Sequence, residues 1–146
     1  MTTRTIKLDL SDFTPTPTQQ RVLDCREGRV LFSGGYGSGK TRIGAEASTI
    51  LSIENPGCAG IVVSPTNQML TRTTRLALRE ALPRELIRRE RLSDRAIDLI
   101  NGSTIYYGSA DNPGSLEGTN LAWAWIDEAR LISVEAYRIL IGRIRD

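Results

Sequence analysis

The chain has 146 residues with an ordinary globular composition, which is enough for one domain with a sizeable core. Its formal net charge of +2 excludes a broadly basic chain, and the absence of histidine leaves carboxylates, lysine, arginine and an oxygen-bound metal for any catalysis. No apolar run reaches the length of a membrane span, and the first ten residues lack the apolar core of a signal peptide. We therefore expect a cytoplasmic protein without membrane contact.

The N-terminal segment, residues 1–12, is polar with alternating apolar residues, which fits either a short edge strand or an unpaired arm. The prolines that follow keep the chain extended, because each one pushes the residue before it out of the helical region. A helix is predicted to begin at Thr18, whose hydroxyl suits the N-cap, and to end near Gly28. We expect an N-terminal arm, residues 1–17, followed by one domain, residues 18–146.

The most informative stretch is residues 34–41, which read G-x-x-x-x-G-K-T, the phosphate-binding P-loop pattern. An apolar run of strand type, residues 29–33, precedes it, and apolar residues at helical spacing follow it until Asn55-Pro56-Gly57. Glycines let successive backbone N–H groups converge on phosphate oxygens, and the positive end of the new helix points at the same phosphates. The candidate nucleotide-binding residues here are Gly34, Gly35, Tyr36, Gly37, Ser38, Gly39, Lys40 and Thr41.

Two residues of this loop have individual roles in this interpretation. Lys40 neutralises β- and γ-phosphate charge and so counts among the catalytic residues. The hydroxyl of Thr41 holds Mg²⁺, so the expected ligands are ATP and Mg²⁺. The alternative is a glycine-rich turn before a helix, with no ligand.

Strands and helices alternate in the next part of the chain. A continuous apolar run predicts a buried parallel strand at residues 59–64, and a helix is predicted at residues 68–82. Residues 84–91 are dense in charge of both signs and are predicted to be helical. Two strand-like runs then flank Asn101-Gly102, which predicts a hairpin of residues 96–107 with a type I′ turn.

The last part of the chain predicts a loop at residues 108–120, a strand at residues 121–126 and a helix capped by Ser133. Apolar strands alternating with helices predict an α/β fold with a mostly parallel sheet flanked by helices, in which the hairpin is an antiparallel insertion or edge. A ligand is expected at the carboxyl ends of the strands. The apolar face of the last helix is predicted to carry Val134, Tyr137, Leu140, Ile141 and Ile144.

The strand at residues 121–126 ends in two adjacent carboxylates, Asp127 and Glu128, which is the Walker B pattern. Successive side chains at a strand end point in different directions, so the two carboxylates can have different tasks. Asp127 is the candidate metal ligand, reaching Mg²⁺ through water beside Thr41, and Glu128 is the candidate general base for an attacking water. The alternative is a strand that simply stops at a charged loop.

A glutamine upstream of the P-loop is the third candidate element. The amide of Gln19 has one acceptor and two donors, which match the N6 amine and N7 of adenine, and Phe13 can pack against the base. The alternative is a solvent-facing helix start, where glutamine is common.

With these elements placed, the chain resembles the ATPase domain of phage terminase large subunits, the motors that pump DNA into capsids. The resemblance rests on Pro17-Thr18-Gln19, residues 33–42, the Asn101-Gly102-Ser103 hairpin, residues 108–118 and Trp125-Ile126-Asp127-Glu128-Ala129. It implies a RecA-like P-loop fold of the additional-strand type and places Arg42 with the nucleotide-binding loop. It also implies that Gln19 contacts adenine and that Glu128 is the catalytic carboxylate.

The same resemblance implies viral genome packaging driven by ATP hydrolysis in the host-cell cytoplasm. The implied partners are double-stranded DNA, a small terminase subunit, the capsid portal and other copies of the chain in a ring. The family often carries Arg-Gly where this chain has Glu117-Gly118, so no phosphate contact is assigned to that loop. The family continues with a coupling strand and a nuclease domain, so we expect no nuclease activity and an incomplete core, with Val134, Leu140 and Ile144 partly uncovered.

The arginines leave two interpretations open. Arg72, Arg75 and Arg79 fall on one helical face, which suits either contact with DNA phosphates or a solvated face balanced by glutamates. One of the arginines after Glu128 can be the finger that a neighbouring subunit of a ring receives. Two other functions remain as alternatives, a helicase-like DNA-dependent ATPase and a nucleotide-binding fragment without turnover.

Overall fold

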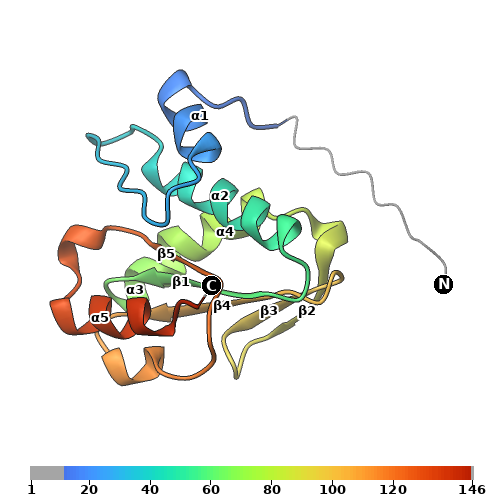
Figure 1. Ribbon diagram of the computed structural model, residues 1–146, viewed down its shortest axis with the longest axis vertical. Coiled ribbons are helices and arrows are strands. Elements are labelled where there is room, and N and C mark those ends of the chain that lie inside the picture. Colours follow the sequence, from blue (N-terminus) through green and yellow to red (C-terminus); the bar gives the residue numbers. More distant parts are fainter. Residues whose placement is uncertain (1–11, 146) are drawn as a thin grey trace.

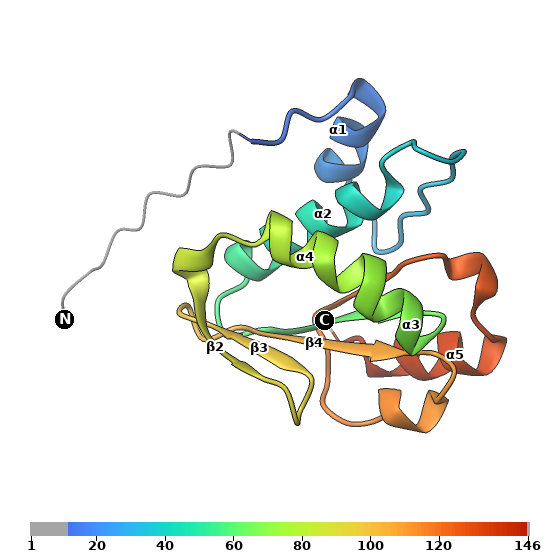
Figure 2. The same cartoon turned by 180° about the vertical axis from the view of Figure 1, so that it is seen from behind.

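The structure is a computed structural model that describes residues 12–145. Within these residues one five-stranded sheet has the strand order β2-β3-β4-β1-β5, with helices on both faces (Figures 1 and 2). The strands are β1 (Ala59–Ser64), β2 (Ile87–Arg91), β3 (Ala96–Leu99), β4 (Thr104–Ser109) and β5 (Trp123–Ile126). The helices are α1 (Pro17–Asp24), α2 (Lys40–Glu54), α3 (Asn67–Met69), α4 (Arg75–Ala81) and α5 (Val134–Arg143).

The centre of the sheet is parallel and one side of it is antiparallel. Strand β1 pairs in parallel with β4 and with β5, whereas β3 pairs antiparallel with β2 and β4. The α/β fold predicted from the sequence, with a hairpin beside parallel strands, is therefore confirmed. β2 is a strand that the sequence reading did not expect.

Alternating side chains of β1 supply both faces of the sheet. Val62 points into a core shared with α2 and α4, where Leu78 is fully buried. Ile61 and Val63 point into a second core under α5, where Leu140 is fully buried. Because β1 is covered on both faces, its sequence is apolar without interruption.

The strand predicted for residues 29–33 is not formed, so this expectation was wrong. These residues are irregular, and Val30 and Leu31 have 48% and 83% of their surface exposed. An apolar run becomes a strand only when a neighbouring strand supplies a hydrogen-bond ladder, and β5 is the last strand on this side of the sheet.

Among residues 12–145, the outer edge of the sheet is bridged only at Leu121, just before β5 begins. The backbone N–H of Leu121 donates to the carbonyl of Arg143 at 2.8 Å, and the N–H of Arg145 donates to the carbonyl of Leu121 at 3.0 Å. These bonds form an isolated parallel bridge between Leu121 and Ile144. The rest of this edge has no strand paired to it among the described residues.

Helix α5 is capped by the Ser133 hydroxyl, which accepts from the N–H of Ala136 at 3.1 Å, as predicted. Its apolar face is only partly the predicted one. Leu140 is fully buried, contrary to expectation, whereas Val134 and Tyr137 are exposed. Ala136, which is fully buried, faces the core in place of Tyr137.

The predicted helix at residues 68–82 is interrupted by a π-helical turn, η1 (Leu70–Thr74), between α3 and α4. Thr66 caps its start by accepting from the N–H of Met69 at 3.2 Å. At the other end the N–H of Arg75 bonds to the carbonyl of Leu70, five residues back. This wider turn changes which side chains after Leu70 face the sheet.

Residues 84–91 were predicted to be helical and are not. A single 3₁₀ turn, η2 (Arg84–Leu86), leads into β2, which pairs with β3. The side chain of Glu90 on β2 accepts hydrogen bonds from Arg75 and Arg79 of α4 and, at 3.2 Å, from the hydroxyl of Tyr107 on β4. These tertiary contacts override the local helical preference of a charged segment.

The predicted hairpin is present, but its turn is not type I′. Of the two turn residues Asn101 and Gly102, only Gly102 has a positive φ, of 87°, and the N–H of Leu99 donates to the carbonyl of Ser103 at 2.8 Å across a longer loop. The amide of Asn101 donates instead to the carbonyl of Ser52 at 2.8 Å. Asn101 therefore ties the hairpin to the end of α2 rather than adopting a left-handed conformation.

Helix α1 begins earlier than predicted. Thr16, not Thr18, is the N-cap, and Pro17 is the first helical residue, where its missing N–H costs nothing. Thr16 and Gln19 form a reciprocal capping box, in which the Thr16 N–H donates to the side-chain oxygen Oε1 of Gln19 at 2.9 Å. The segment with alternating apolar residues lies largely outside the described residues. Among residues 12–145, no helix is both long enough and apolar enough to cross a membrane.

Candidate nucleotide-binding site

The glycine loop runs from Ser33 to the first turn of α2 and lies open to solvent. Gly37 and Gly39 have φ values of 74° and 76°, which only glycine adopts without strain. The ammonium group of Lys40 reaches back across the loop and donates to the carbonyls of Gly34 at 2.9 Å and Gly35 at 2.7 Å. The lysine is thus already held over the concave side of the loop.

The first N–H groups of α2 have no side-chain cap. The N-cap is Gly39, which has no side chain to accept from the first N–H groups, and the first turn contains no acidic residue. These N–H groups and the positive end of a helix of 15 residues are therefore free for an anion.

Thr41 of α2 and Asp127 at the end of β5 meet, although they are 86 residues apart in the sequence. The Thr41 hydroxyl donates to Asp127 Oδ1 at 3.2 Å and lies 3.3 Å from Oδ2. Asp127 is 7% exposed, so its carboxylate is held in the interior next to the start of α2. The structure brings together the two residues predicted to share a metal.

Two further hydroxyls extend this contact. Thr74, the last residue of η1, donates to Asp127 Oδ2 at 2.7 Å. Ser64, at the end of β1, donates to Thr74 Oγ1 at 2.5 Å. Sequence reasoning missed both residues. Thr74 lies in a threonine-rich segment that matches no motif. The only indication in the sequence was for Ser64, which ends a predicted strand at the edge of the sheet where a ligand is expected.

Glu128 adopts an unusual backbone conformation. Its φ and ψ are 48° and 47°, in the left-handed region that a glutamate rarely occupies. The side chain is 29% exposed and accepts from Arg130 Nε at 3.2 Å. Backbone strain of this kind collects at functional positions, because the surrounding structure must hold it.

Gln19 is brought against the glycine loop. It is 6% exposed, and a Cβ atom added to Gly39 would lie 2.4 Å from Gln19 Nε2. Its carbonyl oxygen is used in the capping box with Thr16, so its amide N–H groups are the part left for a ligand.

Arg42 and Tyr36 contribute to the loop differently from the other candidates. The guanidinium of Arg42 pairs with Glu46 at 2.6 Å, lies 3.9 Å from Glu80, and lies over the Phe13 ring at 5.0 Å. The side chain of Tyr36 is fully exposed. Both residues therefore have only their backbone N–H groups to offer to a phosphate. The ring of Phe13, which was expected to pack against the base, is covered by Arg42.

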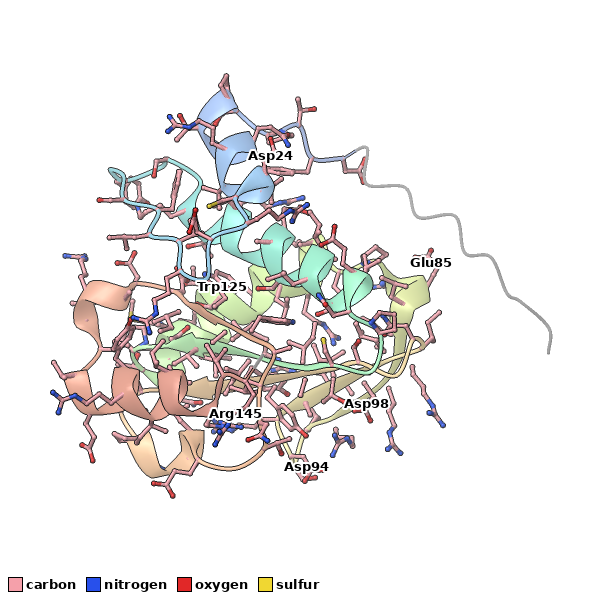
Figure 3. The ribbon with its side chains drawn as sticks, viewed as in Figure 1. Asp24, Glu85, Asp94, Asp98, Trp125 and Arg145 are labelled. Carbon is pink, nitrogen blue, oxygen red and sulfur yellow. The ribbon has the colours of Figure 1, made fainter. Side chains whose placement is uncertain are left out.

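Trp125 of β5 sets the distance between α2 and the end of the sheet. A Cβ atom added to Gly44 would lie 2.1 Å from its indole ring. Figure 3 places Trp125 beneath α2, on the strand that leads to Asp127. Only glycine at position 44 allows α2 to approach this closely.

The donor set fits a hard divalent cation that is completed by a ligand. Within residues 12–145 no three carboxylate or cysteine side chains gather into a cage for a metal. One carboxylate and one hydroxyl beside a phosphate-binding loop is instead the arrangement that suits Mg²⁺ bound together with phosphates. The Thr41–Asp127 contact supports this fit, because it brings together two oxygen ligands of the kind that Mg²⁺ prefers.

The arginines of α4 are largely committed to Glu90. Arg75 and Arg79 both pair with its carboxylate, which favours the balanced, solvated face over a stripe for DNA phosphates. Burial alone would raise the pKa of Glu90, but the hydrogen bond and charge of Arg75 and the charge of Arg79 lower it below its ordinary value.

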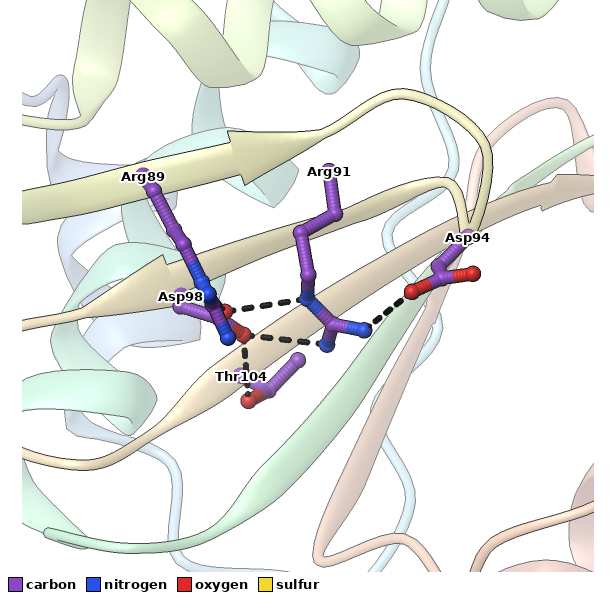
Figure 4. Close-up of polar contacts among 5 residues, drawn as sticks. All are labelled: Arg89, Arg91, Asp94, Asp98 and Thr104. Carbon is purple, nitrogen blue, oxygen red and sulfur yellow. Dashed lines mark hydrogen bonds and ion pairs between the residues drawn. The ribbon is translucent and has the colours of Figure 1, made fainter.

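A second cluster of charges covers the outer surface of the hairpin (Figure 4). Asp98 of β3 accepts from Arg91 at 2.9 Å, from Arg89 at 2.7 Å and from Thr104 at 3.1 Å. Hydrogen bonds from Arg91 and Arg89 lower the pKa of Asp98 to about 2. Asp94 pairs with Arg91 from the turn between β2 and β3.

Comparison with known proteins decides the family. The family model for the terminase large subunit, T4likevirus-type, N-terminal, matches residues 31–145. The chain belongs to this family. No curated protein sequence matches it.

Solved terminase structures share the fold. The ATPase domain of the large terminase from Thermus phage P74-26 superposes with a TM-score of 0.79 at 18% identity, over 92% of this chain and 61% of that one. A large terminase from a thermophilic bacteriophage has a TM-score of 0.69 at 18% identity, over 88% of this chain and 34% of that one. The chain thus spans about three fifths of the first of these terminase domains. The expected terminase-type P-loop fold is confirmed.

Proposed function

We propose that this chain is the nucleotide-hydrolysing part of a terminase large subunit and that it binds ATP with Mg²⁺. The observation that carries the proposal is the contact between Thr41 and Asp127 at the mouth of the glycine loop. Family membership supports it, because the matching model describes the N-terminal part of terminase large subunits. An accidental glycine turn would not place its threonine against the carboxylate at the end of the neighbouring strand.

Each candidate residue has a task in this proposal. The N–H groups of residues 34–42 surround the phosphates, and Lys40 exchanges its two loop carbonyls for β- and γ-phosphate oxygens. Mg²⁺ supplies neutralisation of phosphate charge when it is bound between the nucleotide, Thr41 and Asp127. Gln19 donates to the adenine ring from its place beside Gly39.

In the hydrolytic step, Glu128 is the general base that accepts the proton of the attacking water. Its carboxylate orients a water molecule in line with the terminal phosphate and accepts the proton as the water attacks. To do so Glu128 exchanges its contact with Arg130, an exposed side chain whose ion pair is weak in water. The two adjacent carboxylates have different partners, since Asp127 contacts Thr41 and Thr74 whereas Glu128 contacts Arg130, and this supports the division of labour.

The wider role that we propose is genome packaging. Hydrolysis would drive double-stranded DNA into a capsid in the host cytoplasm, with a small terminase subunit, a portal and a ring of identical chains as partners. Support comes from the terminase family and from the large terminases that share the fold. The family also favours this role over a helicase-like ATPase.

Nucleotide binding without turnover is the second candidate, and one observation favours it. The outer edge of β5 is largely open, and Leu31 before the loop is 83% exposed. A loop whose preceding segment is not fixed in a sheet holds phosphates less rigidly, and catalysis depends on that rigidity.

The test measures binding and turnover separately. The 146-residue chain is titrated with a fluorescent ATP analogue and Mg²⁺, and phosphate release is followed with and without double-stranded DNA. Lys40→Ala is expected to lose binding, and Glu128→Gln to keep binding and lose turnover. Binding without turnover in the wild type would select the second candidate, and no binding at all would reject both.

A further inference from the structure

The carboxylate of Asp127 is held from two sides. Oδ1 accepts from Thr41 at 3.2 Å and from the N–H of Glu128 at 3.2 Å. Oδ2 accepts from Thr74 at 2.7 Å, the shortest of these contacts. Thr74 is 1% exposed, so water does not compete for this hydrogen bond.

The π-helical turn is what places Thr74 there. A threonine inside a helix can return its hydroxyl to the carbonyl four residues back, as Thr71, near the start of η1, does to Asn67 at 2.9 Å. Thr74, at the end of η1, instead directs its hydroxyl across to the end of β5. π-turns are rare and occur frequently at functional sites, because they cost regular hydrogen bonding.

Ser64 fixes the direction of the Thr74 hydroxyl. It is fully buried and donates to Thr74 Oγ1 at 2.5 Å. The accepting oxygen of Thr74 is thereby occupied, and its own proton is left to point at Asp127. The hydrogen bonds therefore run in one direction, from Ser64 to Thr74 and from Thr74 to the Asp127 carboxylate.

We propose that Thr74 is a positioning residue, which holds Asp127 in the orientation needed to bind Mg²⁺ with the nucleotide. This inference rests on the proposed function. When Mg²⁺ and nucleotide bind, the hydroxyl oxygen of Thr41 would face the metal, so Thr41 would serve both the metal and Asp127. Thr74 lies on the other side of the carboxylate and keeps its contact in both states.

A hydrogen bond that orients a metal-binding side chain commonly contributes about tenfold or more to metal affinity. Removing the Thr74 hydroxyl is therefore expected to raise the Mg²⁺ concentration needed for half-maximal nucleotide binding by about tenfold. Nucleotide affinity without metal should stay the same, because the glycine loop and Lys40 do not contact Thr74. A loss of folding would instead weaken nucleotide binding both with and without Mg²⁺.

The experiment measures binding of a fluorescent ATP analogue to the whole chain as a function of Mg²⁺. Thr74→Val removes the hydroxyl at nearly constant volume, and Thr74→Ser restores it. Thr71→Val is the matched control, because it removes a hydroxyl of the same turn that bonds only to a backbone carbonyl. Ser64→Ala is expected to give a smaller change in the same direction.

The expected result is a tenfold shift in Thr74→Val, recovery in Thr74→Ser and no shift in Thr71→Val. An unchanged Mg²⁺ dependence in Thr74→Val, with binding intact, would overturn the positioning role alone. Equal shifts in Thr74→Val and Thr71→Val would also overturn it, since the effect would then come from the helix. Failure of the wild type to bind nucleotide at any Mg²⁺ concentration would instead overturn the proposed function, and the inference with it.

Discussion

Gly44 and Trp125 lie in such close contact that a Cβ atom on Gly44 would stand 2.1 Å from the indole ring. Gly44 is one helical turn beyond Thr41, and Trp125 lies on the strand that ends at Asp127. The close approach of helix and strand at this point is therefore what allows the threonine hydroxyl to reach the carboxylate. The packing of α2 against β5 thus determines the geometry of the nucleotide site.

Gly44→Ala is expected to lower the free energy of unfolding by about 1–3 kcal/mol, because the added methyl group forces α2 or the indole ring to move. Urea unfolding followed by Trp fluorescence measures the change. Gly142→Ala is the control, since Gly142 lies in α5 with no atom within 4 Å of an added Cβ. Alanine there is expected to be neutral or to add up to about 1 kcal/mol. Equal effects of the two substitutions would contradict the packing argument.

Glu128→Asn and Glu128→Gln are expected to lose ATP turnover alike and to differ in stability. Both remove the carboxylate and its contact with Arg130, but asparagine tolerates the left-handed region better than glutamine. The asparagine variant should therefore unfold with a free energy about 0.5–1 kcal/mol higher than the glutamine variant. Chemical denaturation of the two proteins side by side makes the comparison. Equal stabilities would mean that the backbone at position 128 carries no strain.

Asp98 makes stability depend on pH in the acid range. Its folded pKa of about 2 lies below the ordinary aspartate value of about 3.9, so the unfolded chain binds more protons between these values. The stabilisation is fully present above about pH 5 and is lost as the pH falls towards 2. Because Arg89 is 64% exposed and solvent screens the cluster, its magnitude is about 1 kcal/mol.

Asp98→Asn is expected to be less stable than the wild type at pH 7 and to approach it near pH 2.5. Urea unfolding at a series of pH values gives both curves. Asp111→Asn, at an exposed aspartate without an ion pair among the described residues, should follow the wild type throughout. A constant difference between Asp98→Asn and the wild type at all pH values would show that the charge of Asp98 is not what stabilises the hairpin.

The site was largely predictable because its parts are local motifs. The glycine loop, Lys40 and Thr41 are contiguous, and Asp127-Glu128 follow a recognisable apolar strand. Their meeting in space followed from the rule that ligands bind at the carboxyl ends of parallel strands. Thr74 was not predictable, because its position depends on a π-turn that no residue of the segment signals.

The errors in the fold have a common physical origin, which is dependence on partners distant in the sequence. Residues 29–33 have the composition of a strand but no ladder to join, and Leu31 stays exposed. Residues 84–91 have the composition of a helix, but pairing with β3 and the contact of Glu90 with Arg75 make them a turn and a strand. Capping was misplaced by only two residues, because Thr16 and Thr18 carry the same chemistry and only the reciprocal contact with Gln19 distinguishes them.

The π-turn has a consequence for how this segment can evolve. Because η1 holds one more residue than an α-helical turn, it rotates everything after it by about 100° relative to an uninterrupted helix. The burial of Leu78 against the sheet and the pairing of Arg75 and Arg79 with Glu90 both depend on that rotation. Deleting one residue between Leu70 and Thr74 would restore a regular helix in which the residues after Thr74 keep their present faces, so these contacts would persist. A helix of the present length without the π-turn would instead turn Leu78, Arg75 and Arg79 away from their present partners.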